Sequence, residues 1–382
     1  AQVPGATLMT TGFLMAPQVV AWHGDPSAVR LFIDGVEREE VTPRTQGITD
    51  FALIPLWTFE QVTLEITAGE LRVHARTWRV DRTTASTRTD VLTGSENLNL
   101  FRGYFGKRSA GGLAVQFAAQ QASTVSAPGM DGDGLGAMAR LGWASGSWSI
   151  DATLIRQGLD RNTGVRFPLT VPQKDALPSF HGSASLAYLR AAWRDPQGSG
   201  PWAQIVAATM GAVKTHPGAA SGFGSTSTVV ADSADTTSSR AQYSASGGVN
   251  RGSLRLSGVA RIRSAGGKAD AAPSVRAEWA WERLSVSANA GRRFGGARVW
   301  DLRGAIVPRE WLRVSASTGL SQASLDAGAS GRAGSTVDAA LRVRGRWLSV
   351  GAIRLARGPI AAPIELDTAM RSATVPEGKA IT

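Results

Sequence analysis

The sequence contains no cysteine, only four histidines and no long apolar run. Without cysteine there are no disulfides, thiol nucleophiles or thiolate metal sites, which fits a bacterial cell-envelope protein. No apolar run approaches the roughly 20 residues that a membrane helix needs, so a helical membrane protein is excluded. His23, His74, His181 and His216 lie far apart and lack metal-ligand spacing, so we expect neither a metal site nor a cofactor.

Catalytic motifs are missing as well. There is no Gly-x-Ser-x-Gly elbow, and Gly103–Lys107 lacks the glycine spacing and the following Ser or Thr of a phosphate-binding loop. Asp131 and Asp133 fall in an expected outer loop, where paired carboxylates can hold calcium, but the later glutamate of a full calcium loop is absent. We therefore interpret them as part of a polar turn and predict that the protein is not an enzyme.

The charge is strongly positive, with a formal net value of +11. Basic proteins often bind nucleic acid through its phosphates. Here, however, the arginines are spread over alternate positions along the chain instead of being gathered in one run. This spacing favours arginines that line a barrel lumen or face lipopolysaccharide phosphates, and we expect no nucleic-acid partner.

From about residue 98 onward, apolar and polar residues alternate. Trp148, Ile150, Ala152 and Leu154 are apolar, and the residues between them are polar. Successive side chains of a strand point to opposite faces, so the pattern predicts strands with one apolar and one polar face. Their length of about ten residues suits a tilted membrane strand. We expect strands at Thr87–Thr93, 98–107, 113–121, 135–144, 148–157, 184–194, 202–213, 240–249, 253–263, 274–282, 284–293, 297–307, 311–320, 336–345 and 347–356.

Short turns alternate with long polar connections, as they do in outer-membrane barrels. The pattern therefore predicts an all-β fold, a transmembrane antiparallel barrel of about 14–16 strands. An even strand number requires either a short closing strand near Ile364–Met370 or a chain that continues past Thr382, and we expect truncation. The long connections are expected near 122–134, 158–183, 214–239, 264–273 and 321–335.

Tryptophans gather beside the predicted short turns. Trp favours the headgroup level of a bilayer, where an apolar ring and a polar N–H are both satisfied. We expect an interface girdle, although core tryptophans of a large soluble β-protein are the alternative. The girdle residues are Trp143, Trp148, Trp193, Trp202, Trp281, Trp311 and Trp347.

Charged residues occupy the polar face of several predicted strands. A charge on the lipid face costs roughly 2–4 kcal/mol at the midplane, so these residues are expected to face the lumen. A positive lumen would favour anions, whereas mutual pairing would only tie strands together. The lumenal residues are Arg255, Arg261, Arg263, Arg276, Glu278, Arg342 and Arg344.

Residues 1–85 show a different pattern. A short apolar strand, Val29–Val36, contains an Asp-Gly turn signal, and an Ile-Pro pair and a Phe-Glu-x-Val-x-Leu stretch follow before a glycine. This order resembles the plug domain of TonB-dependent outer-membrane receptors over residues 29–69. Little of a full plug precedes the Asp-Gly turn, and no energy-coupling box is evident near residue 1. The matching plug-motif residues are Asp34, Gly35, Ile54, Pro55, Glu60 and Gly69.

The resemblance implies a plug-like segment at 1–85 and a barrel at 86–382 in the outer membrane of a Gram-negative-type bacterium. Solute passage or receptor-type uptake is the expected function. A non-transporting barrel that anchors partners and a soluble secreted β-rich binding protein are the alternatives. Expected partners are outer-membrane lipid, lipopolysaccharide and a periplasmic energy-coupling or envelope protein.

Overall fold

Most residues that the computed structural model describes are in β-strands. Among these residues, no helix is long and apolar enough to cross a bilayer. The positions outside the description are 1–4, 11–17, 24–27, 39–48, 67–69, 96, 126–130, 162–179, 216–235, 266, 295, 297, 323–330, 344–345, 358–359, 362–373, 376–377 and 382.

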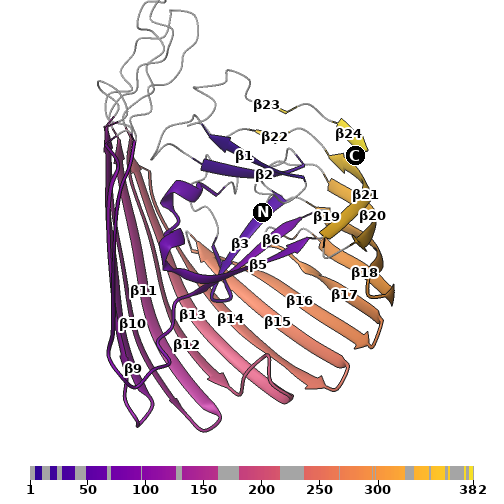
Figure 1. The fold of residues 1–382 in the computed structure, drawn as a ribbon, viewed down its shortest axis with the longest axis horizontal. Coiled ribbons are helices and arrows are strands. Elements are labelled where there is room, and N and C mark those ends of the chain that lie inside the picture. Colours follow the sequence, from indigo (N-terminus) through magenta and orange to yellow (C-terminus); the bar gives the residue numbers. More distant parts are fainter. Residues whose placement is uncertain are drawn as a thin grey trace, which may run out of the picture.

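One large antiparallel sheet dominates the fold. In the described part of the chain it has 16 strands in the order β24-β21-β20-β19-β18-β17-β16-β15-β14-β13-β12-β11-β10-β9-β8-β7, and it curves around the N-terminal strands (Figure 1). The predicted all-β barrel fold is confirmed. The strands are β7 (Ser86–Thr93), β8 (Asn99–Arg108), β9 (Leu113–Val125), β10 (Asp131–Ser145), β11 (Trp148–Arg161), β12 (Phe180–Trp193), β13 (Gly200–Thr215), β14 (Thr236–Arg251), β15 (Leu254–Ala265), β16 (Lys268–Trp281), β17 (Leu284–Arg292), β18 (Arg298–Arg309), β19 (Leu312–Gln322), β20 (Gly331–Val343), β21 (Arg346–Arg357) and β24 (Gly378–Ile381).

Every strand expected between Thr87 and residue 356 is present, but several are longer than predicted. β15 and β16 pair from Leu254↔Trp279 to Ala265↔Lys268, so the long connection expected at 264–273 is wrong. Asp131 and Asp133 lie in β10 and not in a turn, because β9 continues to Val125 and pairs with them. The closing strand expected at Ile364–Met370 lies outside the described residues, and β24 is the strand that pairs with β21.

The sheet has an apolar outer face and a more polar inner face. On β10 the outer Leu135 is 66% exposed, whereas the inner Met138 is 2% exposed. The period-two pattern thus positions alternate side chains toward the surroundings or toward the N-terminal segment. We use inner face for the side of the sheet that packs on residues 1–85.

The N-terminal segment, residues 1–85, forms two small sheets (Figure 1). The first of these sheets pairs β1 (Ala6–Thr10) with β2 (Gln18–Trp22). Outside this segment, near the C-terminus, β22 (Ile360–Ala361) pairs with β23 (Thr374–Val375). The four-stranded sheet has the order β4-β3-β6-β5, with β3 and β6 parallel. Its elements are β3 (Val29–Ile33), β4 (Val36–Arg38), the 3₁₀ turns η3 (Phe51–Leu53) and η4 (Leu56–Thr58), β5 (Phe59–Ile66) and β6 (Leu71–Thr77).

A shared apolar core joins this segment to the inner face of β9–β13. Burial of each large side chain here stabilises the folded state by roughly 1.5–3 kcal/mol, so this core contributes substantially to holding the segment on the wall. The cluster contains Leu31, Ile33, Val36, Ile54 and Ala75 from the segment and Ala118, Met138, Ile155, Leu186, Tyr188, Val206, Ala208, Met210 and Ala212 from the wall.

Candidate functional site

The turn between β3 and β4 places a carboxylate against the barrel wall. Ile33 pairs with Val36, which leaves Asp34 and Gly35 as a two-residue turn. Their φ angles are 49° and 87°. An Asp-Gly pair suits such a turn, because both central positions need positive φ. The turn predicted from the sequence is present, and the Asp34 side chain is fully buried.

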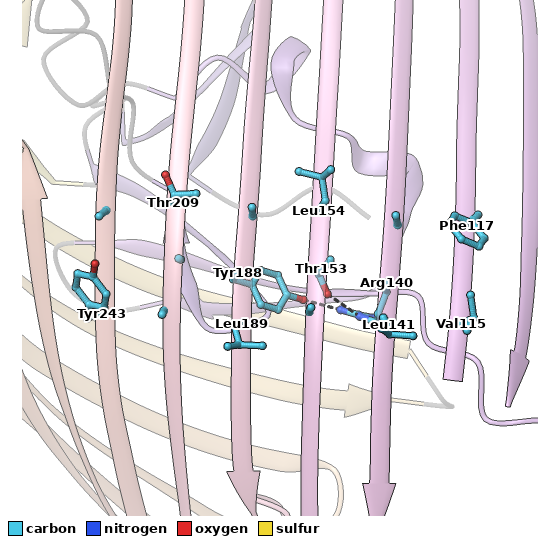
Figure 2. A pocket seen from close by; sticks show the side chains of 16 residues that line it. Val115, Phe117, Arg140, Leu141, Thr153, Leu154, Tyr188, Leu189, Thr209 and Tyr243 are labelled. Carbon is cyan, nitrogen blue, oxygen red and sulfur yellow. Dashed lines mark hydrogen bonds between the residues drawn. The ribbon is translucent and has the colours of Figure 1, made fainter. Parts of the chain in front are cut away.

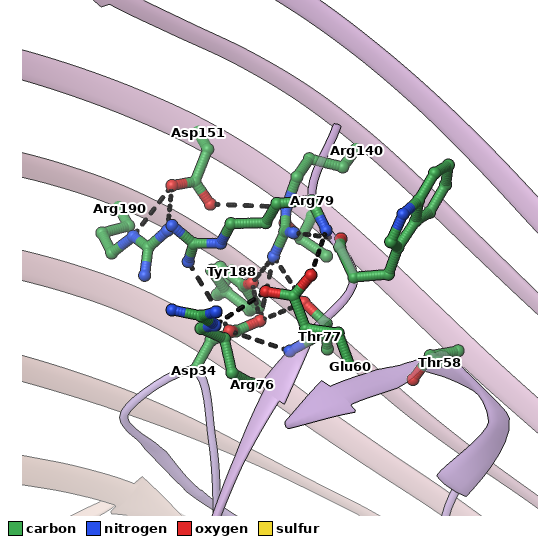
Figure 3. A network of polar contacts seen from close by, with 12 residues as sticks. Asp34, Thr58, Glu60, Arg76, Thr77, Arg79, Arg140, Asp151, Tyr188 and Arg190 are labelled. Atoms are coloured by element: carbon green, nitrogen blue, oxygen red, sulfur yellow. Dashed lines mark hydrogen bonds and ion pairs between the residues drawn. The ribbon is translucent and has the colours of Figure 1, made fainter. Parts of the chain in front are cut away.

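The Asp34 carboxylate receives hydrogen bonds from both the segment and the wall (Figure 3). Arg140 Nη2 on β10 donates to Oδ2 at 2.9 Å, and the Tyr188 hydroxyl on β12 donates at 2.6 Å. The backbone N–H of Thr77 donates to Oδ1 at 3.2 Å. One carboxylate therefore ties β3 and β6 of the segment to two strands of the wall.

The charges around Asp34 keep it ionised. Burial by itself would raise its pKa, but the guanidiniums of Arg140 and Arg79 and the hydroxyls of Thr77 and Tyr188 hold its pKa below the ordinary value. Arg140 is 3% exposed, and Asp34 at 2.9 Å is its nearer counter-charge, with Asp151 farther away at 3.8 Å. A buried pair of this kind is costly to break from one side only.

The wall prepares Arg140 for this contact. Its Nε donates to Thr153 Oγ1 at 2.9 Å, and its Nη1 donates to the carbonyl of Trp78 at 2.9 Å. On the next strands, Arg190 Nε donates to Asp151 at 2.8 Å. The register of β11 and β12 brings these two side chains together, since Asp151 lies directly opposite Arg190. Sequence reasoning missed Arg140 and Tyr188, and their only signal was a polar residue at an inner-face position.

Two inner-face glycines leave room for tryptophans of the segment. A Cβ on Gly136 would lie 2.8 Å from Trp57 Cζ2, and one on Gly106 would lie 2.9 Å from Trp78 Cη2. Trp57 Nε1 also donates to Gln157 Oε1 at 3.2 Å. The wall is therefore shaped to this segment at its backbone as well as at its side chains.

A second contact, against β15–β18, is made almost wholly of charges. Arg276 Nη1 donates to Glu65 Oε1 at 2.7 Å, and Arg261 approaches Glu37 at 3.6 Å. Burial would raise the pKa of Glu65, but the His74 hydrogen bond and the guanidiniums of Arg72 and Arg276 lower its pKa to about 2. The segment is thus held on β9–β13 by an apolar core together with the Asp34 network, and on β15–β18 mainly by ion pairs.

Most of the charges predicted to be lumenal lie on the inner face. Arg276 also pairs with Glu278 at 2.5 Å, and Arg263 pairs with Asp270 at 3.2 Å. Arg255 is exposed and lies opposite Glu278. Arg342 belongs to β20, and Arg344 lies outside the described residues.

No protein-family model and no curated protein matches the sequence. Solved structures do match its fold. The FrpB iron transporter of Neisseria meningitidis matches at 12% identity and TM-score 0.57, covering 93% of this chain and 76% of that one. A variant of the ferric enterobactin receptor PfeA of Pseudomonas aeruginosa matches at 11% identity and TM-score 0.66, covering 94% and 68%. The copper transporter OprC matches at 10% identity and TM-score 0.65, covering 92% and 67%.

These proteins are all TonB-dependent outer-membrane receptors. The chain has the fold of that family. The resemblance predicted from residues 29–69 is confirmed at the level of the fold, and the named neighbours are transporters and receptors, not enzymes. In the described residues of this receptor fold, no cluster of three or more His, Asp or Glu side chains is placed to hold a metal ion.

The plug-motif residues of the receptor fold take three kinds of position. Asp34 and Gly35 form the turn described above, and Ile54 is buried in the shared apolar core. The Pro55 carbonyl accepts the Thr58 N–H at 2.9 Å and so shapes η4. Gly69 lies outside the described residues.

Glu60 belongs to the charged surroundings of Asp34 (Figure 3). It pairs with Arg76 at 2.7 Å and accepts the Arg79 backbone N–H at 3.3 Å. The Arg79 guanidinium also lies 3.5 Å from Asp34. Arg79 therefore connects two motif residues that are far apart in the sequence.

The outer face of the receptor fold is apolar. Figure 2 shows Phe117, Leu141, Leu154 and Leu189 on neighbouring strands, and all four are exposed. Four of the girdle tryptophans lie on this face beside short turns, namely Trp143, Trp148, Trp193 and Trp281. Trp311 is exposed within the turn between β18 and β19.

The expectation for Trp202 is wrong. On β13, Ile205 is outward and Val206 is buried on the inner face, so the alternation places Trp202 on the inner face with Val206. Its Nε1 also lies 3.0 Å from the position of a Cβ on inner-face Gly248. Proximity to a turn predicted how close the indole ring lies to the end of the strand, but not which face of the sheet the ring occupies. Trp347 lies in β21, where only the strand is described.

Proposed function

We propose that this protein is an outer-membrane receptor that takes up a solute through its barrel, with residues 1–85 as the plug and residues 86–382 as the barrel. The observation that carries the proposal is the Asp34 turn, which fixes the segment to inner-face residues Arg140 and Tyr188. A receptor that only anchored partners would have no need to close its lumen with a dedicated segment.

The comparisons support transport as the class of activity. The neighbours are named as transporters of iron or copper and as a ferric enterobactin receptor. The exposed apolar side chains of the outer face suit contact with outer-membrane lipid, and its arginine-rich chain suits lipopolysaccharide phosphates. We include both as partners.

Moving the plug takes work, because the shared apolar core and the Asp34 network both have to be broken. We therefore propose a periplasmic energy-coupling protein as a further partner. Passage of solute would then depend on that partner and not on a permanently open lumen.

Conductance across a planar bilayer tests the plug. The intact chain should be nearly silent, and deletion of residues 1–85 should open a steady conductance. An intact chain that conducts as well as the deletion variant would contradict the plug assignment. A folded deletion variant that stays silent would favour the non-transporting barrel. Heat-modifiable migration in gels checks that each barrel is folded, and partition into the outer-membrane fraction tests the location.

A further inference from the structure

A cavity of about 200 Å³ lies between the plug and a part of the wall that the Asp34 network does not touch. The plug supplies β3, β5 and β6, and the wall supplies β15–β18, which Figure 1 shows on the side away from β10 and β11. Its lining includes Arg30, Phe32, Arg72 and His74 from the plug and Arg261 and Arg276 from the wall.

This lining is rich in cationic groups. Among the described residues it contains five arginines and His74, against the single carboxylate of Glu65. Burial and the neighbouring Arg30 guanidinium lower the pKa of Arg72, although the Glu65 and Asp301 carboxylates oppose this change. Carboxylates just outside the lining also pair with these arginines: Glu70 accepts from Arg72 at 3.1 Å and lies 3.5 Å from Arg30, and Asp301 lies 3.5 Å from Arg72.

The nearby carboxylates are shared between arginines. Glu37 accepts from Arg30 at 2.7 Å and lies 3.6 Å from Arg261. Glu65 accepts from Arg276 at 2.7 Å and lies 3.5 Å from Arg72. A guanidinium carries five N–H donors in a planar fork, so Arg30, Arg72 and Arg276 retain donor capacity for a further acceptor.

An aromatic ring holds the cations in place. The Phe32 ring is stacked on His74 at 4.9 Å between centroids. The guanidiniums of Arg30 and Arg261 each lie 5.2 Å from the ring centroid. Cation–π contacts and stacking therefore fix these groups around the cavity and reduce the ordering needed on binding.

We infer that this cavity binds a small oxyanion of the phosphate class. Bidentate arginine forks match the geometry of such an anion. The cavity is several times the roughly 30 Å³ that one water occupies in the liquid, so a tetrahedral anion with some water fits. It is smaller than the roughly 300–1,000 Å³ of sites for larger organic ligands. The inference does not depend on the proposed transport function.

Calorimetric titration with inorganic phosphate tests it, using the full-length chain in phosphate-free detergent at low ionic strength. The wild type should bind one phosphate saturably. Arg72→Gln and Arg276→Gln should each weaken binding at least tenfold, since each removes charge-assisted hydrogen bonds. Arg255→Gln is the matched control: it removes the same charge from the inner face outside the cavity and should change binding less than twofold.

A second variant leaves every charge in place. Ser274→Leu fills the cavity from the wall and should abolish binding while the chain keeps heat-modifiable migration. Absence of saturable binding by the wild type overturns the inference. So does wild-type affinity in a folded Ser274→Leu variant. An Arg255→Gln effect as large as that of Arg276→Gln would show that a generally positive lumen, and not this cavity, attracts the anion.

Discussion

Asp34 combines a backbone role with an electrostatic one. Its positive φ closes the β3–β4 turn, and its carboxylate compensates Arg140 and accepts the Tyr188 hydroxyl. The residue therefore serves both the local hairpin and its attachment to the wall. Few residue types meet both needs, because apart from glycine Asp and Asn tolerate positive φ best, and of these only Asp carries the charge.

Replacing Asp34 by Asn should weaken the attachment strongly. The turn persists, but buried Arg140 loses its nearer carboxylate and keeps only Asp151 at 3.8 Å, which it shares with Arg190. Breaking a buried ion pair from one side costs up to roughly 3–5 kcal/mol. Urea unfolding in detergent, followed by tryptophan fluorescence, measures the loss. Asp90→Asn removes a carboxylate from an exposed pair with Arg88 and should change the unfolding midpoint little. Equal effects of the two substitutions would contradict the role assigned to Asp34.

Gly136 is a second single residue with a measurable role. A Cβ there would lie 2.5 Å from Gln157 Oε1 and 2.8 Å from Trp57 Cζ2. Gly136→Ala should destabilise the protein by about 1–3 kcal/mol through overpacking, with a shift in tryptophan emission. Gly103→Ala on β8 is the control, since nothing lies within 4 Å of its Cβ position. Unchanged stability of Gly136→Ala would show that Trp57 is free to move aside.

Sequence reasoning predicted the Asp34–Gly35 turn but not its partners. The turn is a local property of two adjacent residues, and their residue types are enough to predict it. Arg140 and Tyr188 lie 106 and 154 positions away. Their proximity depends on the register of several strands and on where the segment sits, which residue types alone do not specify.

At the scale of strands, the alternation of apolar and polar residues predicted well which strands exist and which side chains face outward. It predicted poorly where each strand ends. β15 and β16 extend beyond their expected ends, to Ala265 and from Lys268. Arg263 pairs there with Asp270, so residues that look like a polar loop in the sequence continue the ladder. Polarity near a strand end does not distinguish a loop from the inner face of a longer strand.

Acid should loosen the contact of β5 and β6 with the wall. Glu65 has a pKa of about 2 in the folded protein, against an ordinary value of 4.5. A lowered folded-state pKa stabilises the protein fully above the ordinary value, and this contribution is lost as pH falls from about 4.5 toward about 2. Urea midpoints measured across that range should fall more steeply in the wild type than in Glu65→Gln. Parallel curves would contradict the shift.

The outer face offers a test of depth within one strand. Leu154 lies near the middle of β11, and Ile150 lies close to its first turn on the same face. Leu154→Arg should cost roughly 2–4 kcal/mol, whereas Ile150→Arg should cost about 0–1 kcal/mol nearer the headgroups. Refolding into phospholipid vesicles measures both. Equal and small costs would mean that lipid does not cover this face.

Over the whole molecule, consecutive strand order could be predicted, whereas the contents of the lumen could not. Antiparallel neighbours joined by short turns follow from the alternation and the turn signals. The contacts of residues 1–85 with the wall join residues as distant as Glu65 and Arg276, 211 positions apart. The resemblance to plug motifs suggested a plug, but the difference between its apolar and charged contacts emerged only from the structure.

The apolar outer face also constrains how a cell can make this protein. Leu135, Ile205 and Val275 are each more than 60% exposed. Apolar patches much above a few hundred Å² cause association in water. The folded protein, if released into an aqueous compartment, would therefore aggregate with other copies of itself. The proposed lipid contact therefore predicts that the chain is delivered unfolded, bound to a carrier protein, and folds only on reaching the membrane.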